Sequence, residues 1–211
     1  MSDLADKLAG KFIVIDGPDG AGKTTQIELL AEQLRGSGLK VCTTRDPGGT
    51  AIGDKIRAIL LDKANGGMAV ECETMLYMAS RAQLVSQVIR PALSRSECVL
   101  CDRYVSATVA YQGAGGADPA AIRAVGEVAV GGLWPDLTIV LDLPADVGLK
   151  RLTTAPDRME SKDRDFHARV RELFLQQAAD EPARFAVIDA SGSVHEVQQR
   201  LLKAIREHRF A

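Results

Sequence analysis

The chain has 211 residues, of which 26% are charged, and its formal net charge is -2. This length suits one domain with a sizeable core, and the charge balance gives no overall basic field of the kind that nucleic-acid binders use. No apolar run approaches the roughly 20 residues of a membrane-spanning helix, and the first residues, MSDLADKLAGK, lack the apolar core of a signal peptide. We therefore expect a single domain, residues 1–211, in the cytoplasm, with no nucleic-acid or membrane partner.

A strand, a loop and a helix are predicted first. The apolar run FIVID at 12–16 is typical of a strand buried on both faces, and a helix follows from about 23 to 35. Between them, the pattern of Gly, four residues, then Gly-Lys-Thr is the signature of a loop that wraps nucleotide phosphates. Backbone N–H groups of such a loop and the positive end of the following helix bind anions. The loop residues are Gly17, Pro18, Asp19, Gly20, Ala21, Gly22, Lys23, Thr24 and Thr25.

Two side chains of this phosphate loop suit phosphoryl chemistry, and one is unexpected. Lys23 is expected to reach the terminal phosphates and Thr24 to supply a hydroxyl to Mg²⁺. Asp19 is an acid in a loop built for anions, which is tolerable if its carboxylate faces a second substrate and not the nucleotide phosphates. A chance glycine-rich turn is disfavoured, because the loop lies between a strand and a helix.

A second strand is predicted at 41–44, and RDPGGT after it is a loop by its Pro and Gly content. The amphipathic helix that comes next is marked by Ile52, Ile56, Ile59 and Leu60. Its apolar stripe fits either the core of the chain or an interface between two copies. Arg45, the first residue of this loop, and Arg57, on the helix, carry planar groups that suit phosphate recognition.

A long helix is predicted from Glu71 to Arg90, where Pro91 stops it. Tyr77 and Arg81 are four residues apart and share a face of this helix. An aromatic ring with a neighbouring guanidinium can stack on a base and donate hydrogen bonds to it. A core tyrosine beside a surface arginine is the alternative interpretation.

The third predicted strand, CVLC at 98–101, ends in Asp102. An acid at this position can hold a metal-bound water or polarise an acceptor. Asp16 and Asp142 end similar strands, so the assignment is open between three acids, and we favour Asp102 because Arg103 follows it.

Polar side chains also recur at helical spacing after this strand. Thr108, Tyr111 and Gln112 share one helical face, because they are three and four residues apart. Their polar groups would converge on one small region, although such a face is more often solvated.

Capping signals place two further helices, and strands are predicted at 137–143 and 185–190. Asp118 is expected to cap a helix that Gly131 closes, and Ser193 a last helix through a capping box.

The segment 144–178 is mostly helical but is interrupted by TTAPDR, a composition that suits a mobile lid at about 151–164. Strands alternate with helices throughout the chain. This order predicts an α/β fold with three αβα layers and a five-stranded parallel sheet. Ligands are expected at the carboxyl ends of its strands.

Five stretches together resemble bacterial thymidylate kinases, a family of P-loop nucleoside monophosphate kinases: DGPDGAGKTT, RDPGGT, the helix with Tyr77 and Arg81, DRY at 102–104 and AYQG at 110–113. The similarity extends from about Phe12 to the C-terminus. It implies transfer of the ATP γ-phosphoryl group to dTMP, giving dTDP, in dTTP biosynthesis. It also implies that ATP binds the phosphate loop, that Mg²⁺ is the cofactor, and that the chain forms a homodimer.

The resemblance implies how the thymine base is held. Tyr77 would stack on the ring and Arg81 would donate to its O4. Thr108 and Gln112 would lie beside the pyrimidine edge.

The same resemblance implies residues for the sugar and the phosphate of dTMP. Tyr111 would crowd the 2′ position, and Asp19 would meet the 3′-hydroxyl. The dTMP phosphate would be bound by Arg45, Arg57 and Arg103.

The sequence departs from its relatives in two places. Asp46 stands in RDPGGT where many relatives have Glu, and KRLTTAPDRM is shorter and less basic than the lid of some of them. The phosphate loop has no arginine, so the charge that stabilises phosphoryl transfer must come from elsewhere. We predict that Arg158 is the main transition-state arginine and that Arg151 assists it; two solvated surface arginines are the alternative.

Two other functions stay open from the residues alone. The acceptor could be another pyrimidine monophosphate, or the chain could be a nucleotide-hydrolysing switch. A switch needs a residue that orients water and an element that orders with the γ-phosphate. The sequence offers no clear candidate for either, whereas it does offer a second polar pocket.

Overall fold

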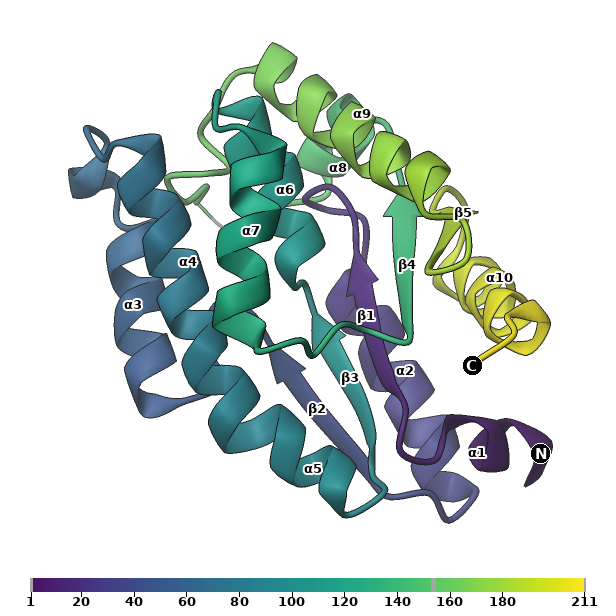
Figure 1. Ribbon diagram of the computed structural model, residues 1–211. Coiled ribbons are helices and arrows are strands. Elements are labelled where there is room, and N and C mark those ends of the chain that lie inside the picture. The colour runs from purple at the N-terminus through teal and green to yellow at the C-terminus, as the bar shows by residue number, and fades with distance from the viewer. Residues whose placement is uncertain (1, 153–154, 211) are drawn as a thin grey trace.

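The computed structural model describes residues 2–152 and 155–210, and its centre is a five-stranded parallel sheet (Figure 1). The strand order is β2-β3-β1-β4-β5. The strands are β1 (Phe12–Asp16), β2 (Val41–Arg45), β3 (Cys98–Asp102), β4 (Leu137–Asp142) and β5 (Phe185–Asp189). All five residues of β1 are buried, as its apolar sequence predicts. The α/β fold with a five-stranded parallel sheet is therefore confirmed.

Helices cover both faces of the sheet, and successive residues of β1 divide the core between them. Ile13 and Ile15 pack on one side with α1 (Ser2–Leu8), α2 (Lys23–Gly36) and α10 (Val194–Glu207). Phe12 and Val14 pack on the other side with α4 (Val70–Leu84), α6 (Val105–Ala114) and α7 (Pro119–Val130). This division follows from the two-residue period of a strand.

The remaining helices extend these two layers. Phe166, Val170 and Phe174 of α9 (Arg164–Asp180) pack with α6 over β4. The other helical segments are α3 (Ala51–Leu61), a 3-10 turn at Lys63–Asn65, α5 (Arg90–Ser94) and α8 (Ala145–Lys150). Across the described parts of the chain, no helix combines the length and the apolar character that crossing a membrane requires.

The predicted end of the long helix at Pro91 is wrong. The helical path continues from α4 through a π-helical turn, Val85–Ile89, into α5, which runs to Ser94. A π-helical turn changes the hydrogen-bond spacing from four to five residues. Pro91 then stands in the first turn of the new α-helix, where its missing N–H is not needed.

The predicted helix caps are confirmed. The side chain of Asp118 accepts a hydrogen bond from the backbone N–H of Ala120, 3.0 Å away. Ser193 and Glu196 form the capping box of α10. The predicted interruption of the 144–178 region is present between α8 and α9; Thr153 and Thr154, which suggested its mobility, lie outside the described residues.

Candidate active site

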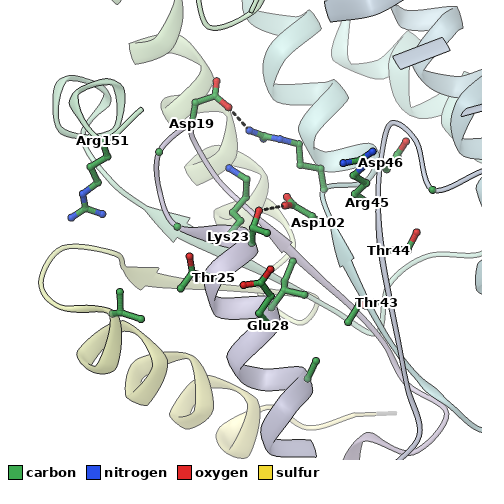
Figure 2. A pocket seen from close by; sticks show the side chains of 18 of the residues that line it. Asp19, Lys23, Thr25, Glu28, Thr43, Thr44, Arg45, Asp46, Asp102 and Arg151 are labelled. Atoms are coloured by element: carbon green, nitrogen blue, oxygen red, sulfur yellow. Dashed lines mark hydrogen bonds and ion pairs between the residues drawn. The ribbon is translucent and has the colours of Figure 1, made fainter. Parts of the chain in front are cut away.

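An open cleft of about 1270 Å³ lies at the carboxyl ends of β1, β2 and β3. Figure 2 shows Lys23 and Asp102 inside this cleft, with Arg151 on one side and Arg45 on the other. Six residues of the predicted phosphate loop line the cleft: Asp19, Gly20, Gly22, Lys23, Thr24 and Thr25. Gly17, Pro18 and Ala21, which were also predicted to bind ATP, do not line it.

The phosphate loop is held in shape by close packing against β4 and α8. A side chain at Gly17 would place its Cβ 2.5 Å from the carbonyl oxygen of Leu141. A side chain at Gly20 would place its Cβ 2.0 Å from the carbonyl oxygen of Gly148. Both glycines also have positive φ angles, which other residues rarely adopt. The loop is therefore built for phosphates before any ligand binds.

Lys23 lies across this loop with its ammonium group inside. Its Nζ donates hydrogen bonds to the carbonyl oxygens of Gly17, at 3.2 Å, and Pro18, at 2.8 Å. Burial lowers the pKa of Lys23, and the nearby charge of Arg103 lowers it further. A phosphate in the loop would replace weak carbonyl partners with an anion.

Asp102 is the only one of the three candidate acids that faces the cleft. The hydroxyl of Thr24 donates to its Oδ2 over 2.9 Å. Asp16 is fully buried and accepts hydrogen bonds from Ser106 and Arg103. Asp142 forms two hydrogen bonds with Arg171. The structure thus places Asp102 beside the phosphate loop, and its role in holding a metal-bound water stays a prediction.

Thr24 and Asp102 form a donor set that fits Mg²⁺. Within residues 2–152 and 155–210, no three His, Cys, Asp or Glu side chains gather as a metal cluster. Mg²⁺ is commonly held by one or two carboxylates with waters and substrate phosphates, so a hydroxyl and one carboxylate are sufficient protein ligands.

A smaller pocket, about 120 Å³, adjoins the cleft. It is lined by eight of the nine residues predicted to bind dTMP: Asp19, Arg57, Tyr77, Arg81, Arg103, Thr108, Tyr111 and Gln112. The ninth, Arg45, lies in the cleft instead, and 58% of its side chain is exposed. We call the smaller cavity the acceptor pocket. Asp19, Arg57 and Arg103 line both cavities, so the two share a wall.

Arg103 is one of the residues of this shared wall. Its guanidinium donates to Asp19 at 2.5 Å, to the carbonyl oxygen of Gly17 at 3.0 Å and to the hydroxyl oxygen of Tyr111 at 2.9 Å. It also forms an ion pair with the buried Asp16, at 3.3 Å. One arginine therefore connects the end of β3 to the phosphate loop and to α6.

The two aspartates beside Arg103 respond differently to it. Burial raises the pKa of Asp16 and outweighs the attraction of Arg103. Burial also raises the pKa of Asp19, but there the charges of Arg103 and Lys23 outweigh it and hold the pKa below its usual value. Asp19 is thus maintained as a carboxylate between the two cavities.

Arg81 is fixed at the floor of the acceptor pocket, with 1% of its surface exposed. It forms an ion pair with Asp46 and donates to the carbonyl oxygen of Tyr104, at 3.0 Å, and to Thr108 Oγ1, at 2.9 Å. A fourth N–H points to the sulfur of Met78. These contacts use four of the five N–H groups that an arginine has.

Arg158 does not line the cleft. It is buried, donates to the carbonyl oxygen of Leu60 at 2.7 Å, and forms an ion pair with Glu73 at 2.6 Å. Arg151 does line the cleft and donates to the carbonyl oxygen of Ala190 at 3.3 Å. In this arrangement Arg158 lies on the acceptor side, so its predicted role at the ATP phosphates would require the segment before α9 to move.

Several residues in or next to the acceptor pocket were not predicted from the sequence. Glu73 lies behind the pocket, where it contacts both Arg158 and Gln112, and it lies on the helical face of Tyr77 and Arg81, four and eight residues earlier. That spacing was the available signal. The pocket itself is lined by Leu61, the last residue of α3, and by the loop residues Pro47, Asp157, Met159 and Glu160. The loop residues give no periodic pattern that would have found them.

Comparisons with known proteins agree with this geometry. The family model described as "Thymidylate kinase" matches residues 15–201. The thymidylate kinase of Alcanivorax borkumensis is 46% identical over 203 residues, which are 95% of this chain and 98% of that one. The thymidylate kinase of Deinococcus radiodurans is 47% identical over 205 residues, covering 94% and 97%.

A solved structure is similar over the same extent. The crystal structure of thymidylate kinase from Ehrlichia chaffeensis has a TM-score of 0.78 and 30% sequence identity, and covers 94% of this chain and 99% of that one. The match therefore extends over nearly the whole of both chains. This chain belongs to the thymidylate kinase family.

Proposed function

We propose that the chain transfers the γ-phosphoryl group of Mg²⁺-bound ATP to dTMP, giving ADP and the dTDP needed for dTTP. The observation that carries this proposal is the wall shared by two cavities. The cleft has a phosphate loop, the acceptor pocket has a base-sized polar interior, and Arg103 and Asp19 line both. Two phosphates bound on the two sides of that wall would lie next to each other, as transfer requires.

On the donor side, the phosphate loop holds the ATP phosphates and Lys23 neutralises their charge. Thr24 and Asp102 would hold Mg²⁺ through the hydroxyl and, directly or through water, the carboxylate. When bound, Mg²⁺ supplies positive charge to the phosphate oxygens on which negative charge develops. Lys23 gives up its carbonyl partners, Gly17 and Pro18, for the phosphate.

On the acceptor side, each part of dTMP has a matching group. The half-buried ring of Tyr77 provides a stacking surface. Arg81 has one N–H without a partner in the described part of the chain, and a base carbonyl can accept it. Arg57 and Arg103 would bind the 5′-phosphate, and Arg45 would reach it from the cleft.

Arg151 and Arg158 are the candidates for stabilising the transferred group. Arg151 already lines the cleft. Arg158 would have to leave Glu73, and separating a buried ion pair costs several kcal/mol. We therefore assign the larger share of transition-state stabilisation to Arg151 and keep Arg158 as the assisting residue, which reverses the order that the sequence suggested.

We also propose that the enzyme works as a cytoplasmic homodimer. Helix α3 packs on α4, and α4 on α7, so that they form one outer layer of the molecule (Figure 1). This layer exposes four large apolar side chains: Ile52, Ile59, Met75 and Val128. Apolar groups gathered on one face favour association with another protein surface.

The experiment is turnover with Mg²⁺-ATP and a panel of monophosphates. We expect kcat/KM to be lower for dUMP than for dTMP by a factor that corresponds to roughly 1 kcal/mol, because dUMP lacks the packing of one methyl group. We expect a further loss of about 1–3 kcal/mol for UMP, because its 2′-hydroxyl would lose hydration against Tyr111 without gaining a partner. Equal kcat/KM for UMP and dTMP would remove that role of Tyr111. ATP hydrolysis that is unaffected by any monophosphate would instead indicate a hydrolytic switch.

A further inference from the structure

Glu73 links two residues of the acceptor side through its two carboxylate oxygens. Oε1 accepts a hydrogen bond from Gln112 Nε2 at 2.5 Å, and Oε2 forms an ion pair with Arg158 NH1 at 2.6 Å. Glu73 lies on α4, Gln112 on α6 and Arg158 in the loop before α9. All three are buried, with exposed fractions of 6%, 1% and 6%.

This arrangement determines which end of the Gln112 amide faces Glu73. A carboxylate in an ion pair can only accept hydrogen bonds, and the NH₂ group is the only donor that a glutamine side chain has. The NH₂ group must therefore point to Glu73, and the amide oxygen must point elsewhere. The assignment follows from donor–acceptor chemistry and does not depend on telling nitrogen from oxygen by position.

The Gln112 oxygen is left without a partner. Oε1 is buried and has no hydrogen-bond partner within the described residues, although Gln112 lines the acceptor pocket. A buried acceptor without a donor is unfavourable, because it has lost its hydration and gained no partner. A ligand that brings an N–H group to this oxygen removes that penalty.

We propose that Glu73 is a specificity-determining positioning residue: it turns the amide oxygen of Gln112 toward the acceptor pocket, so that the pocket selects a base with a ring N–H. The inference rests on the proposed function. Thymine and uracil carry such a donor at N3, between two carbonyl groups. Cytosine has a lone pair at N3, so its binding would leave two buried acceptors facing each other.

The competing role for Glu73 is purely structural, as the anchor of Arg158 and its loop. The two roles differ in what they do to base selectivity. Loss of an anchor weakens all pyrimidine nucleotides alike, whereas loss of the amide orientation weakens those with a ring N–H more than those without.

The test compares binding of dTMP and dCMP by calorimetry in four proteins: wild type, Glu73→Gln, Glu73→Asp and Glu71→Gln. In this variant the side-chain amide at position 73 can donate a hydrogen bond to the Gln112 oxygen. The Gln112 amide can then rotate by a half-turn, so that its oxygen faces position 73. We expect Glu73→Gln to reduce the preference for dTMP over dCMP by at least about tenfold. Glu73→Asp keeps an acceptor-only group and should retain the preference to within about threefold. Glu71 is exposed on the first turn of α4, so its variant should match wild type.

An unchanged dTMP to dCMP ratio in Glu73→Gln, with both nucleotides weakened equally, would overturn the proposal and leave the kinase function intact. If Glu73→Gln does not fold, Gln112→Met replaces it, because that variant removes the same oxygen at similar volume. A ratio unchanged in Gln112→Met would also overturn the proposal. Failure of the proposed function is a separate result: wild type would not phosphorylate dTMP at all.

Discussion

Arg103 shows how one side chain serves two substrates. It follows β3 directly with a φ of 69°, an unusual backbone angle for a residue with a side chain. That backbone turn goes with a guanidinium that lies between Asp16, Asp19 and Tyr111 and within 4.7 Å of the centre of the Tyr111 ring. The acceptor phosphate would compete with these carboxylates for the same N–H groups.

We expect Arg103→Ala to raise KM for dTMP far more than KM for ATP. A charge-assisted contact removed from a closed site costs about 2–4 kcal/mol, or about 30- to 1000-fold in KM. Steady-state kinetics with each substrate varied in turn checks the split, and the exposed Arg95→Ala is the control. A mutant that chiefly weakens ATP would show that Arg103 belongs to the donor side. The Tm should be recorded, because Asp16 would lose its cation.

Asp19 should make the stability of the fold depend on pH in the acidic range. Its folded-state pKa is lowered below the unfolded value of about 3.9. Its contribution is therefore fully present above the unfolded value and is lost as pH falls through the folded one. We expect the Tm gap between wild type and Asp19→Asn to stay constant above about pH 5 and to shrink below about pH 4. Calorimetry over that range checks this, with the exposed Asp165→Asn as control; a gap that widens in acid would contradict it.

At the scale of elements, the phosphate loop depends on the helix it packs against. Gly148 of α8 approaches the loop so closely that a Cβ there would lie 2.2 Å from the carbonyl oxygen of Asp19. The oxygen is a backbone atom and the Cβ would be bonded directly to the backbone. The contact can therefore be relieved only if a backbone segment moves. The geometry of the ATP site is thus set partly by an element that binds no phosphate.

We expect Gly148→Ala to lower the Tm and to raise KM for ATP by at least about tenfold, because the loop must shift to admit the methyl group. Gly36→Ala, at the end of α2, is the matched control, since nothing lies within 4 Å of its added Cβ. Thermal unfolding and ATP kinetics of both variants decide the matter. Equal behaviour of the two variants would mean that the α8 contact does not shape the loop.

Both candidate arginines lie in the segment between α8 and α9. We expect Arg151→Ala to lower kcat at least about a hundredfold with little change in KM for dTMP. Arg158→Ala should instead lower the Tm and raise KM for dTMP, because it leaves Glu73 buried without its cation. If Arg158→Ala mainly lowers kcat at a normal Tm, the segment moves during the reaction and Arg158 is the principal arginine.

Much of the fold and of the candidate site could be predicted from the sequence, and the features that could not be predicted have physical causes. Apolar runs located β1, β3 and β4, because strands buried on both faces have a strong signal. Helical spacing predicted a shared face for Tyr77 and Arg81 and another for Thr108, Tyr111 and Gln112, and all five residues line the acceptor pocket. The burial of Arg158 could not be predicted, since its partner Glu73 is distant in sequence. The π-helical turn before Pro91 is a local change in hydrogen bonding that residue types do not signal.

At the scale of the whole molecule, the layer of α3, α4 and α7 is where a second copy would bind. We expect wild type to sediment as a dimer at micromolar concentration and Val128→Lys to shift it toward monomer, because burying an unpaired ammonium is unfavourable. Val128 is 83% exposed, and Val187→Lys on β5, 44% exposed in the single chain, is the control at another surface. If the dimer persists in Val128→Lys but is lost in Val187→Lys, the interface involves β5 and not this layer.

The strand order β2-β3-β1-β4-β5 also has a consequence for the order of events during synthesis. β1 pairs only with β3 and β4, and β2 only with β3. When the first two strands have left the ribosome they are therefore not each other's neighbours, and the central strand has both hydrogen-bonding edges open. No native strand pair can form until Cys98–Asp102 has been made. Throughout that interval the emerging chain must keep the apolar strand β1 from pairing with other strands.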